Sequence, residues 1–267
     1  MARLRERLIL IYHQVGNYPP ERLGYYGITK DAFRAHLDQL GEMGLEVIPL
    51  ERMIAQMKGE APFRPRAVSL TFDGGFRDGA ETVLPLLAER GYSAAFFVPA
   101  DFIRKEHAVF GAPFPCMDWG QIRELAAAGM TVGSFCRRGA ILEDLPPAGR
   151  REGARAARAT LEDGLGRHVR YHAYMEGYPE GALRRWVIEE GFEAVLTQCP
   201  TFKWRSDPCR IGRIQVDDED PNILKTKASD LYLFFKDIRV WRLIRGFKVD
   251  RLMHRFYALF EKERGGA

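Results

Sequence analysis

One carboxylate stands where an apolar run of this chain ends. Asp73 follows Ala67–Phe72 and precedes Gly74 and Gly75, a pattern that predicts a buried strand with an acidic side chain at its C-terminal tip. The loops that follow the strands of α/β folds gather catalytic residues at such tips. A carboxylate there can act as a general base or as one ligand of a metal ion. An Asp in this position equally suits the N-cap of a following helix.

Three other side chains have types that suit a metal site built around Asp73. His13 lies near the end of the first predicted strand, Cys136 follows a later strand, and His172 lies in a third. Imidazole, thiolate and carboxylate groups all bind zinc. Because aromatic or apolar residues flank both histidines, they also fit hydrogen-bonded structural roles, and Cys136 fits a small apolar core residue. The sequence leaves the two interpretations open.

Alternating strand and helix patterns must position these residues. The expected strands are Leu8–Val15, Leu45–Leu50, Ala67–Phe72, Tyr92–Pro99, Met130–Phe135, Val169–Gly177, Phe192–Thr197 and Arg210–Val216. Helices are expected after Thr29, at Glu51–Lys58, at Gly79–Arg90, from Trp119, at Pro147–Leu165 and up to Glu190. Arg104–Met117 is predicted to be a long loop. This alternation predicts parallel strands covered by helices.

Composition places the chain among ordinary globular proteins. Its 267 residues, 46% apolar and 28% charged, can bury a full core, and the net charge of +4 is too small to indicate nucleic-acid binding. The four cysteines lack CxxC spacing, and the run Leu8–Tyr12 is too short to span a bilayer. No secretory leader pattern is recognised at the N-terminus. We therefore expect free thiols and a cytoplasmic location.

The segment Thr71–Gly75, TFDGG, resembles the TFDDG motif of the polysaccharide deacetylases, the NodB-homology or carbohydrate esterase family four group. Further similarity runs from His13, in YHQV, through Phe96–Val98 to about Val216. The resemblance implies an α/β fold: an irregular (β/α) barrel of about seven units, here with a C-terminal helical extension. It also implies that Asp73 occupies the position of the catalytic base.

The resemblance also shows which reactive positions differ. The family's metal ligands, a second Asp and two His, correspond to Gly74, Phe135 and Gly139. In the third motif Ala173 stands where some members carry an arginine, and no match to the final Leu-x-His motif is found. The sequence therefore predicts no metal cofactor, with a divalent ion such as zinc as the alternative.

A carbohydrate or lipid-linked glycan is the partner that the resemblance implies. Polar and aromatic side chains near the strand tips would offer hydrogen bonds and stacking faces to sugar rings. The candidate substrate-binding residues are His13, Asp78, His172, Tyr174 and Glu176.

The last 39 residues differ in character from the rest. We expect a barrel domain over residues 1–228 and a basic amphipathic helical tail over 229–267, which has seven Lys or Arg between positions 236 and 255. Basic and aromatic residues together are typical of helices on an anionic membrane surface, although a helix packed on the barrel would show the same pattern. The tail is thus a candidate contact with a membrane's inner face or with a protein partner.

Two functions compete at this point. One is a metal-free pseudoenzyme of bacterial surface-polysaccharide metabolism that keeps a carbohydrate-binding cleft. The other is an active carbohydrate deacetylase that uses Asp73 with relocated or absent metal ligands. Because fold alone does not decide function, the geometry around Asp73 must.

Overall fold

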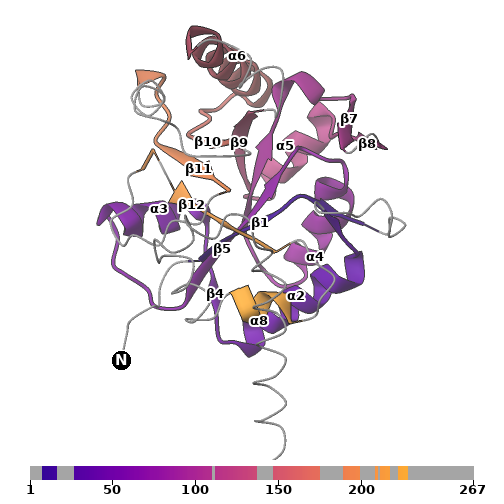
Figure 1. Ribbon diagram of the computed structural model, residues 1–267, viewed down its shortest axis with the longest axis vertical. Helices are drawn as coiled ribbons and strands as arrows, with labels where there is room; N and C mark the ends of the chain where they lie inside the picture. Colours follow the sequence, from indigo (N-terminus) through magenta and orange to yellow (C-terminus); the bar gives the residue numbers. More distant parts are fainter. Residues whose placement is uncertain are drawn as a thin grey trace, which may run out of the picture.

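The computed structural model describes residues 8–16, 27–109, 112–136, 147–174, 189–198, 208–209, 211–216 and 222–227. A nine-stranded parallel sheet forms its centre, in the order β12-β11-β10-β9-β6-β5-β1-β13, with β4 beside β5. Helices α2, α4 and α5 lie along one side of this sheet (Figure 1).

The sheet strands are β1 (Leu8–Tyr12), β4 (Glu46–Val47), β5 (Ala67–Asp73), β6 (Ala94–Val98), β9 (Thr131–Cys136), β10 (Tyr171–Tyr174), β11 (Ala194–Thr197), β12 (Ile211–Gly212) and β13 (Ile214–Gln215). The helices are α2 (Lys30–Glu42), α3 (Leu50–Lys58), α4 (Leu84–Ala88), α5 (Trp119–Ala127), α6 (Pro147–Leu165) and α8 (Ile223–Lys227), with a π-helical turn η2 (Gly79–Val83) and a 3₁₀ turn η3 (Ala100–Phe102). Two small pairs complete the structure: β2 (Gln14–Val15) with β3 (Gly27–Ile28), and β7 (Glu106–Val109) with β8 (Ala112–Pro115).

A single stretch of chain brings the two edges of the sheet together. β12 pairs with β11, whereas β13 pairs with β1, and only Arg213 separates β12 from β13. The Arg213 N–H donates to the Thr197 carbonyl at 3.1 Å, and the Val216 N–H donates to the Ile11 carbonyl at 3.2 Å. The sheet therefore closes into a barrel through this stretch, as the resemblance to the polysaccharide deacetylases implied.

The two faces of the strands pack into two different clusters, because successive side chains of a strand point to opposite sides. The outer face, which includes Leu70 and Phe72 of β5, packs against the surrounding helices. The inner face, which includes Ala67, fills the barrel together with residues of α3. Asp73 has the same parity as Ala67, so the sequence directs its side chain into the barrel.

Local signals fix the helix starts as predicted. The Thr29 hydroxyl accepts from the Ala32 N–H at 3.2 Å, which caps α2. Asp118 and Gln121 form a reciprocal capping box at the start of α5. α6 spans the predicted residues.

Four expectations need correction. The predicted strand Leu8–Val15 is interrupted at His13, because β1 ends at Tyr12 and β2 pairs with β3 in a separate sheet. Arg104–Met117 is not a structureless loop, because it contains the antiparallel hairpin β7–β8. The predicted strand Leu45–Leu50 shortens to two residues, since Pro49 occupies the N-cap position of α3 and Leu50 begins that helix. The helix at Gly79–Arg90 begins with a π-helical turn and ends at Ala88.

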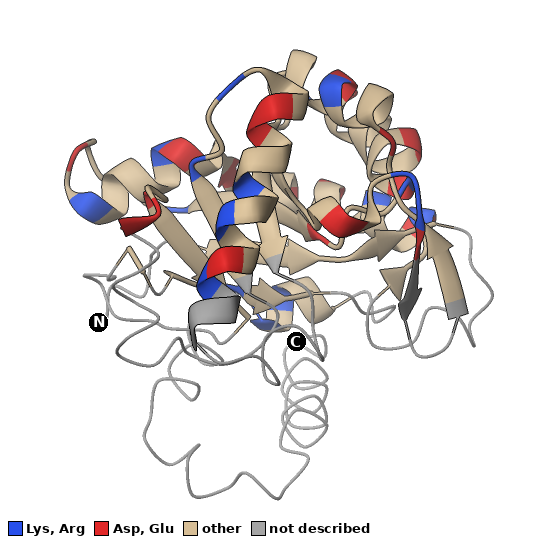
Figure 2. Cartoon of the chain, turned by 90° about the horizontal axis from the view of Figure 1, so that it is seen from above, with Lys and Arg blue, Asp and Glu red and all other residues tan. Residues whose placement is uncertain are grey.

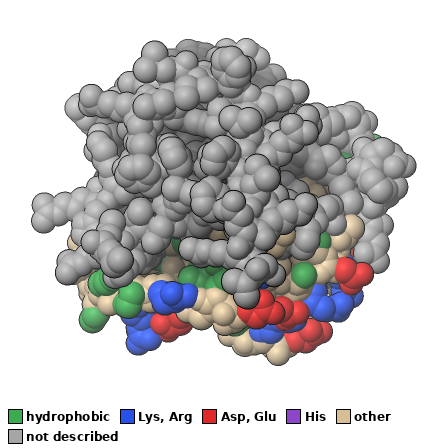
Figure 3. All heavy atoms as spheres, turned by 60° about the horizontal axis from the view of Figure 1, so that its bottom comes forward, with side chains coloured by type: hydrophobic (Ala, Val, Ile, Leu, Met, Phe, Trp, Pro, Cys, Tyr) green, Lys and Arg blue, Asp and Glu red, His purple; other side chains and the backbone are tan. Residues whose placement is uncertain are grey.

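Charged residues lie mainly on the helices and loops around the sheet, whose strands are largely uncharged (Figure 2). On the described part of the face shown in Figure 3, basic and acidic side chains are interspersed. Within the described ranges, no helix combines the length and apolar character that a membrane span requires. Residues 229–267, for which a basic helical tail was predicted, lie outside the described residues.

Candidate functional site

Asp73 and Arg213 form a buried ion pair at the C-terminal end of β5. The two carboxylate oxygens of Asp73 each accept an N–H of the Arg213 guanidinium, from Nη1 and Nη2, at 2.6 Å. Both side chains are completely buried. A buried ion is costly unless it has a hydrogen-bonded partner of opposite charge. Arg213 provides that partner in the geometry that Arg–carboxylate pairs favour.

Arg213 also contacts three other residues of the barrel wall. Its Nη1 donates to the Thr71 hydroxyl at 3.2 Å, and its Nε donates to the Thr197 carbonyl at 3.4 Å. The guanidinium carbon lies 5.3 Å from the centroid of the Phe97 ring, a cation–π contact. The side chain thus connects β5, β6 and β11 across the barrel interior.

The position after Asp73 has no room for the family's second carboxylate. Gly74 has a φ of +99°, and two atoms of the Phe76 ring would lie 2.9 Å from a Cβ added there. Phe76 is held by an isolated bridge to Cys116, and it packs in a small cluster with Phe102 and with Phe114 of β8. The loop therefore positions an aromatic ring beside Gly74.

The other predicted ligand positions do not supply metal ligands either. Phe135 is only 3% exposed and belongs to the cluster that fills the barrel. Gly139 lies outside the described residues. Among the residues that the structure describes, no three His, Cys, Asp or Glu side chains lie close enough to hold a metal ion. Within the described ranges, the donor set therefore does not fit the family's metal.

His13 lies on the same side of the barrel as Asp73. Tyr12 of β1 pairs with Phe72 of β5. His13 and Asp73, the next residue in each chain segment, therefore both come directly after this pair, at the C-terminal end of the two strands. The Nε2 of His13 lies 3.2 Å from the Nε2 of Gln198, which follows β11. The side chains of His13 and Gln198 thus meet at the end of the barrel where Asp73 stands.

Asp78 is buried and has a structural contact. Its Oδ2 accepts the Val15 N–H at 2.8 Å, which joins β2 to the start of η2. Tyr174 ends β10 in register with Cys136, and Glu176 lies outside the described residues. Substrate binding by these three predicted residues stays a prediction.

The structure does not bring His172 together with Asp73. His172 pairs with Ser134 and Val195, and Val195 belongs to the outer cluster, so its ring faces the helices rather than the barrel interior. The ring is fully buried and lies 5.0 Å from that of Phe192, centroid to centroid. Burial lowers the pKa of His172 to about 3. This environment suits a neutral structural histidine.

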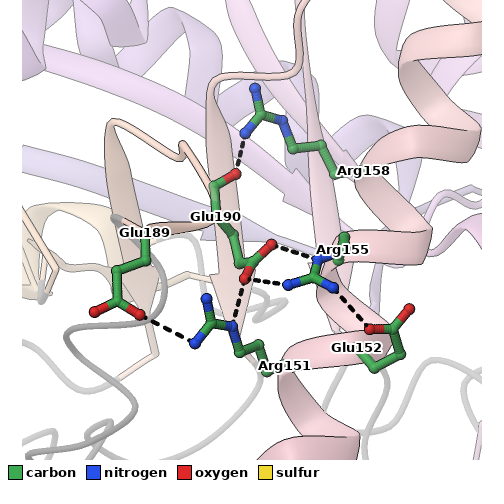
Figure 4. A network of polar contacts seen from close by, with 6 residues as sticks. All are labelled: Arg151, Glu152, Arg155, Arg158, Glu189 and Glu190. Carbon is green, nitrogen blue, oxygen red and sulfur yellow. Dashed lines mark hydrogen bonds and ion pairs between the residues drawn. The ribbon is translucent and has the colours of Figure 1, made fainter.

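A network of charged residues joins α6 to the turn before β11 (Figure 4). The Glu190 carboxylate accepts N–H groups from Arg155 at 2.7 and 2.9 Å and also pairs with Arg151, while the Glu190 carbonyl accepts from Arg158. Hydrogen bonds from Arg155, reinforced by Arg151, lower the pKa of Glu190 to about 2. Both carboxylate oxygens of Glu190 thus accept structural hydrogen bonds on the outside of the barrel.

Sequence reasoning did not single out Arg213 or Gln198. The segment Arg210–Val216 was predicted to form a strand, with no functional residue in it. A usable signal was nevertheless present, because Arg213 shares the parity of Ile211, which faces the barrel interior. An arginine at such a position requires a buried acidic partner.

Comparisons with known proteins agree with this fold. The family model of polysaccharide deacetylase matches residues 60–195, just over half of the chain. IcaB from Ammonifex degensii is 23% identical with a TM-score of 0.74, and the match covers 84% of this chain and 97% of that one. The deacetylase PplD from Streptococcus pyogenes, solved with acetate, is 17% identical with a TM-score of 0.68, over 84% and 98% of the two chains. No curated protein matches the sequence.

The closed parallel barrel with an aspartate at the tip of β5 defines a protein of the NodB-homology type. The chain belongs to the polysaccharide deacetylase family. The structural neighbours are under 25% identical, so they support the fold alone.

Proposed function

We propose that this chain is a metal-free member of the polysaccharide deacetylase family that binds a carbohydrate of bacterial surface-polysaccharide metabolism without hydrolysing it. One observation carries the proposal: Asp73, at the position of the catalytic base, is buried against Arg213, and the neighbouring ligand positions hold Gly74 and Phe135. The family's substrate class motivates the carbohydrate.

The chemistry of deacetylation explains why this observation weighs against hydrolysis. The reaction requires polarisation of the acetyl carbonyl and activation of a water molecule, for which the family uses a bound metal and a base. A divalent cation at Asp73 would lie against the guanidinium of Arg213, a group of like charge. The ring of Phe76 takes the space that a ligand side chain at position 74 would need.

Carbohydrate binding would use groups at the C-terminal end of the barrel. His13 and Gln198 meet there, and Gln198 is partly exposed. An amide and an imidazole offer both donors and acceptors to sugar hydroxyls. Tyr174, which ends β10, and Glu176, two residues further along the chain, complete the proposed contacts.

Metal content and activity provide the direct test. Protein purified without chelators is expected to contain no stoichiometric zinc, cobalt or nickel, and chelation is expected to leave its melting temperature unchanged, because a metal bound to the native state would stabilise it. Acetylated oligosaccharides are expected to be hydrolysed no faster than background. About one equivalent of metal, or metal-dependent deacetylation that Asp73→Asn abolishes, would establish the active-deacetylase alternative.

Ligand binding is tested separately with oligomers of N-acetylglucosamine and of glucosamine. We expect one of the two series to raise the melting temperature, and Gln198→Ala to reduce that shift. Arg64→Ala is the matched control, because Arg64 is exposed and precedes β5, at the opposite end of the barrel. Neither series binding, or equal loss in both variants, would contradict a carbohydrate site at this end.

A further inference from the structure

We infer that Asp73 and Arg213 act together as a structural latch that closes the barrel, so that the family's base position serves here to hold the last strand in place. The latch is defined as this ion pair with its contacts to Thr71, Thr197 and Phe97. It requires no ligand, and it holds whether or not the proposed carbohydrate binding is correct.

Topology supplies the first reason. The stretch Ile211–Gln215 is the point where the two edges of the sheet meet, since β12 pairs only with β11 and β13 only with β1 in the described sheet. Each of these pairings is only two residues long. So few backbone hydrogen bonds give a short strand little stability of its own.

The side chain of Arg213 supplies the second reason. It lies midway between the two short pairings and reaches across the interior to β5, where both oxygens of Asp73 accept its N–H groups at 2.6 Å. Nη1 also donates to Thr71, whose hydroxyl in turn donates to the Leu10 carbonyl of β1 at 2.7 Å. The strand that closes the barrel is therefore tied to β1 and β5 through side chains as well as backbone.

Burial makes the two partners depend on each other. Both side chains are fully enclosed, so removing either charge leaves the other in the interior without its counter-ion. Removing both charges at once, by side chains of similar volume, eliminates that penalty. Strong coupling between the two positions is thus the signature of the latch.

The coupling can be measured by thermal unfolding of Asp73→Leu, Arg213→Met and the double variant. Each single change is expected to lower the melting temperature by roughly 6–20 °C, and the double variant is expected to melt above either single one. Asp73→Asn gives a milder comparison if a single variant fails to fold, because its amide oxygen still accepts one hydrogen bond. Glu193→Gln is the control: it breaks the exposed pair with Arg170 and is expected to cost about 4 °C or less.

Hydrogen exchange in Asp73→Asn shows where the effect occurs. The amides of Arg213 and Val216, which bond to the two edges of the sheet, are expected to exchange roughly a hundredfold faster, while those of Ala94–Val98 keep their protection. Single variants as stable as Glu193→Gln, or exchange that rises uniformly along the sheet, would overturn the latch. Metal-dependent activity of the unmodified protein would refute the proposed function and leave these readouts unchanged.

Discussion

Phe76 lies over Gly74, and its ring closes the position where the family carries its second aspartate. The backbone at Gly74 is in the left-handed region, at φ +99°, which favours glycine. Two atoms of the Phe76 ring would be 2.9 Å from a Cβ at this position. A side chain at position 74 would therefore meet both a strained backbone and the Phe76 ring, so a single substitution does not install a carboxylate here without a shift of the loop.

Gly74→Asp is therefore expected to destabilise the protein by about 2–6 kcal/mol, from backbone strain and overpacking together. Gly59→Asp is the matched control, since Gly59 also has a positive φ, of +82°, but a Cβ added there would meet no atom within 4 Å. The control is expected to cost only the strain contribution, about 1–3 kcal/mol. Unfolding in guanidinium chloride measures the stability of both variants. Equal losses of unfolding free energy would show that the Phe76 ring moves aside without cost.

Glu190→Gln is expected to lower the free energy of unfolding by about 1–3 kcal/mol at pH 7, because it weakens the charged hydrogen bonds from Arg151 and Arg155. The pKa of Glu190 is lowered to about 2, so the folded state favours the ionised form. The difference between the two proteins should shrink as pH falls below about 4.5 and vanish near pH 2.

Denaturant unfolding between pH 2 and 7 checks this expectation, with Glu152→Gln as the control. Glu152 is exposed, and Arg155, at 3.1 Å, is its one ion-pair partner among the described residues, so its removal should change stability little. A difference for Glu190→Gln that stays constant down to pH 2 would mean that the carboxylate's charge is not what stabilises the turn.

His172→Gln is expected to flatten the acid side of the stability profile. Burial lowers the pKa of His172 to about 3, whereas an unfolded histidine titrates near 6.5. Between these pH values the unfolded chain binds a proton that the native protein does not, so native stability falls as pH decreases, by up to about 1.4 kcal/mol per pH unit. Parallel stability profiles for the two proteins between pH 6.5 and 4.5 would contradict this assignment.

The segment 229–267 is expected to contribute either membrane affinity or stability, according to which interpretation of its basic amphipathic pattern holds. Vesicles of anionic and of neutral lipid should be compared for binding of the full chain and of residues 1–228. Surface association should be restricted to anionic vesicles and weaken with salt, because the Debye length is roughly 8 Å at physiological ionic strength. Absence of binding at low salt, with a lower melting temperature for residues 1–228, would favour packing on the barrel.

The fold was predictable because its signals are local. Alternating apolar strands, the Thr29 cap and the run that ends at Asp73 each lie within a few residues, and the structure confirms all three. The hairpin β7–β8 was missed because Pro113 and Pro115 indicate a loop, although prolines are tolerated at the edge of a small antiparallel pair.

The site was harder to predict because its contacts are not local. Arg213 pairs with Asp73 across 140 positions, and no sequence spacing indicates which strand supplies the counter-ion. His172 has a suitable type, but the face that it occupies depends on which side of β10 the barrel encloses. Residue types alone therefore identified the carboxylate and could not identify its partner.

The stretch Ile211–Gln215 pairs with both edges of the sheet, and this has a consequence for biosynthesis. β1 leaves the ribosome well before β13, which is one of its two neighbours in the sheet and the last described strand. Until that strand emerges, the edge of β1 lacks its native cover, and an uncovered strand edge is a site of mispairing and aggregation. Contacts between such distant segments also slow folding. Nascent chains that end before Ile211 should therefore depend on chaperones more than the finished protein does.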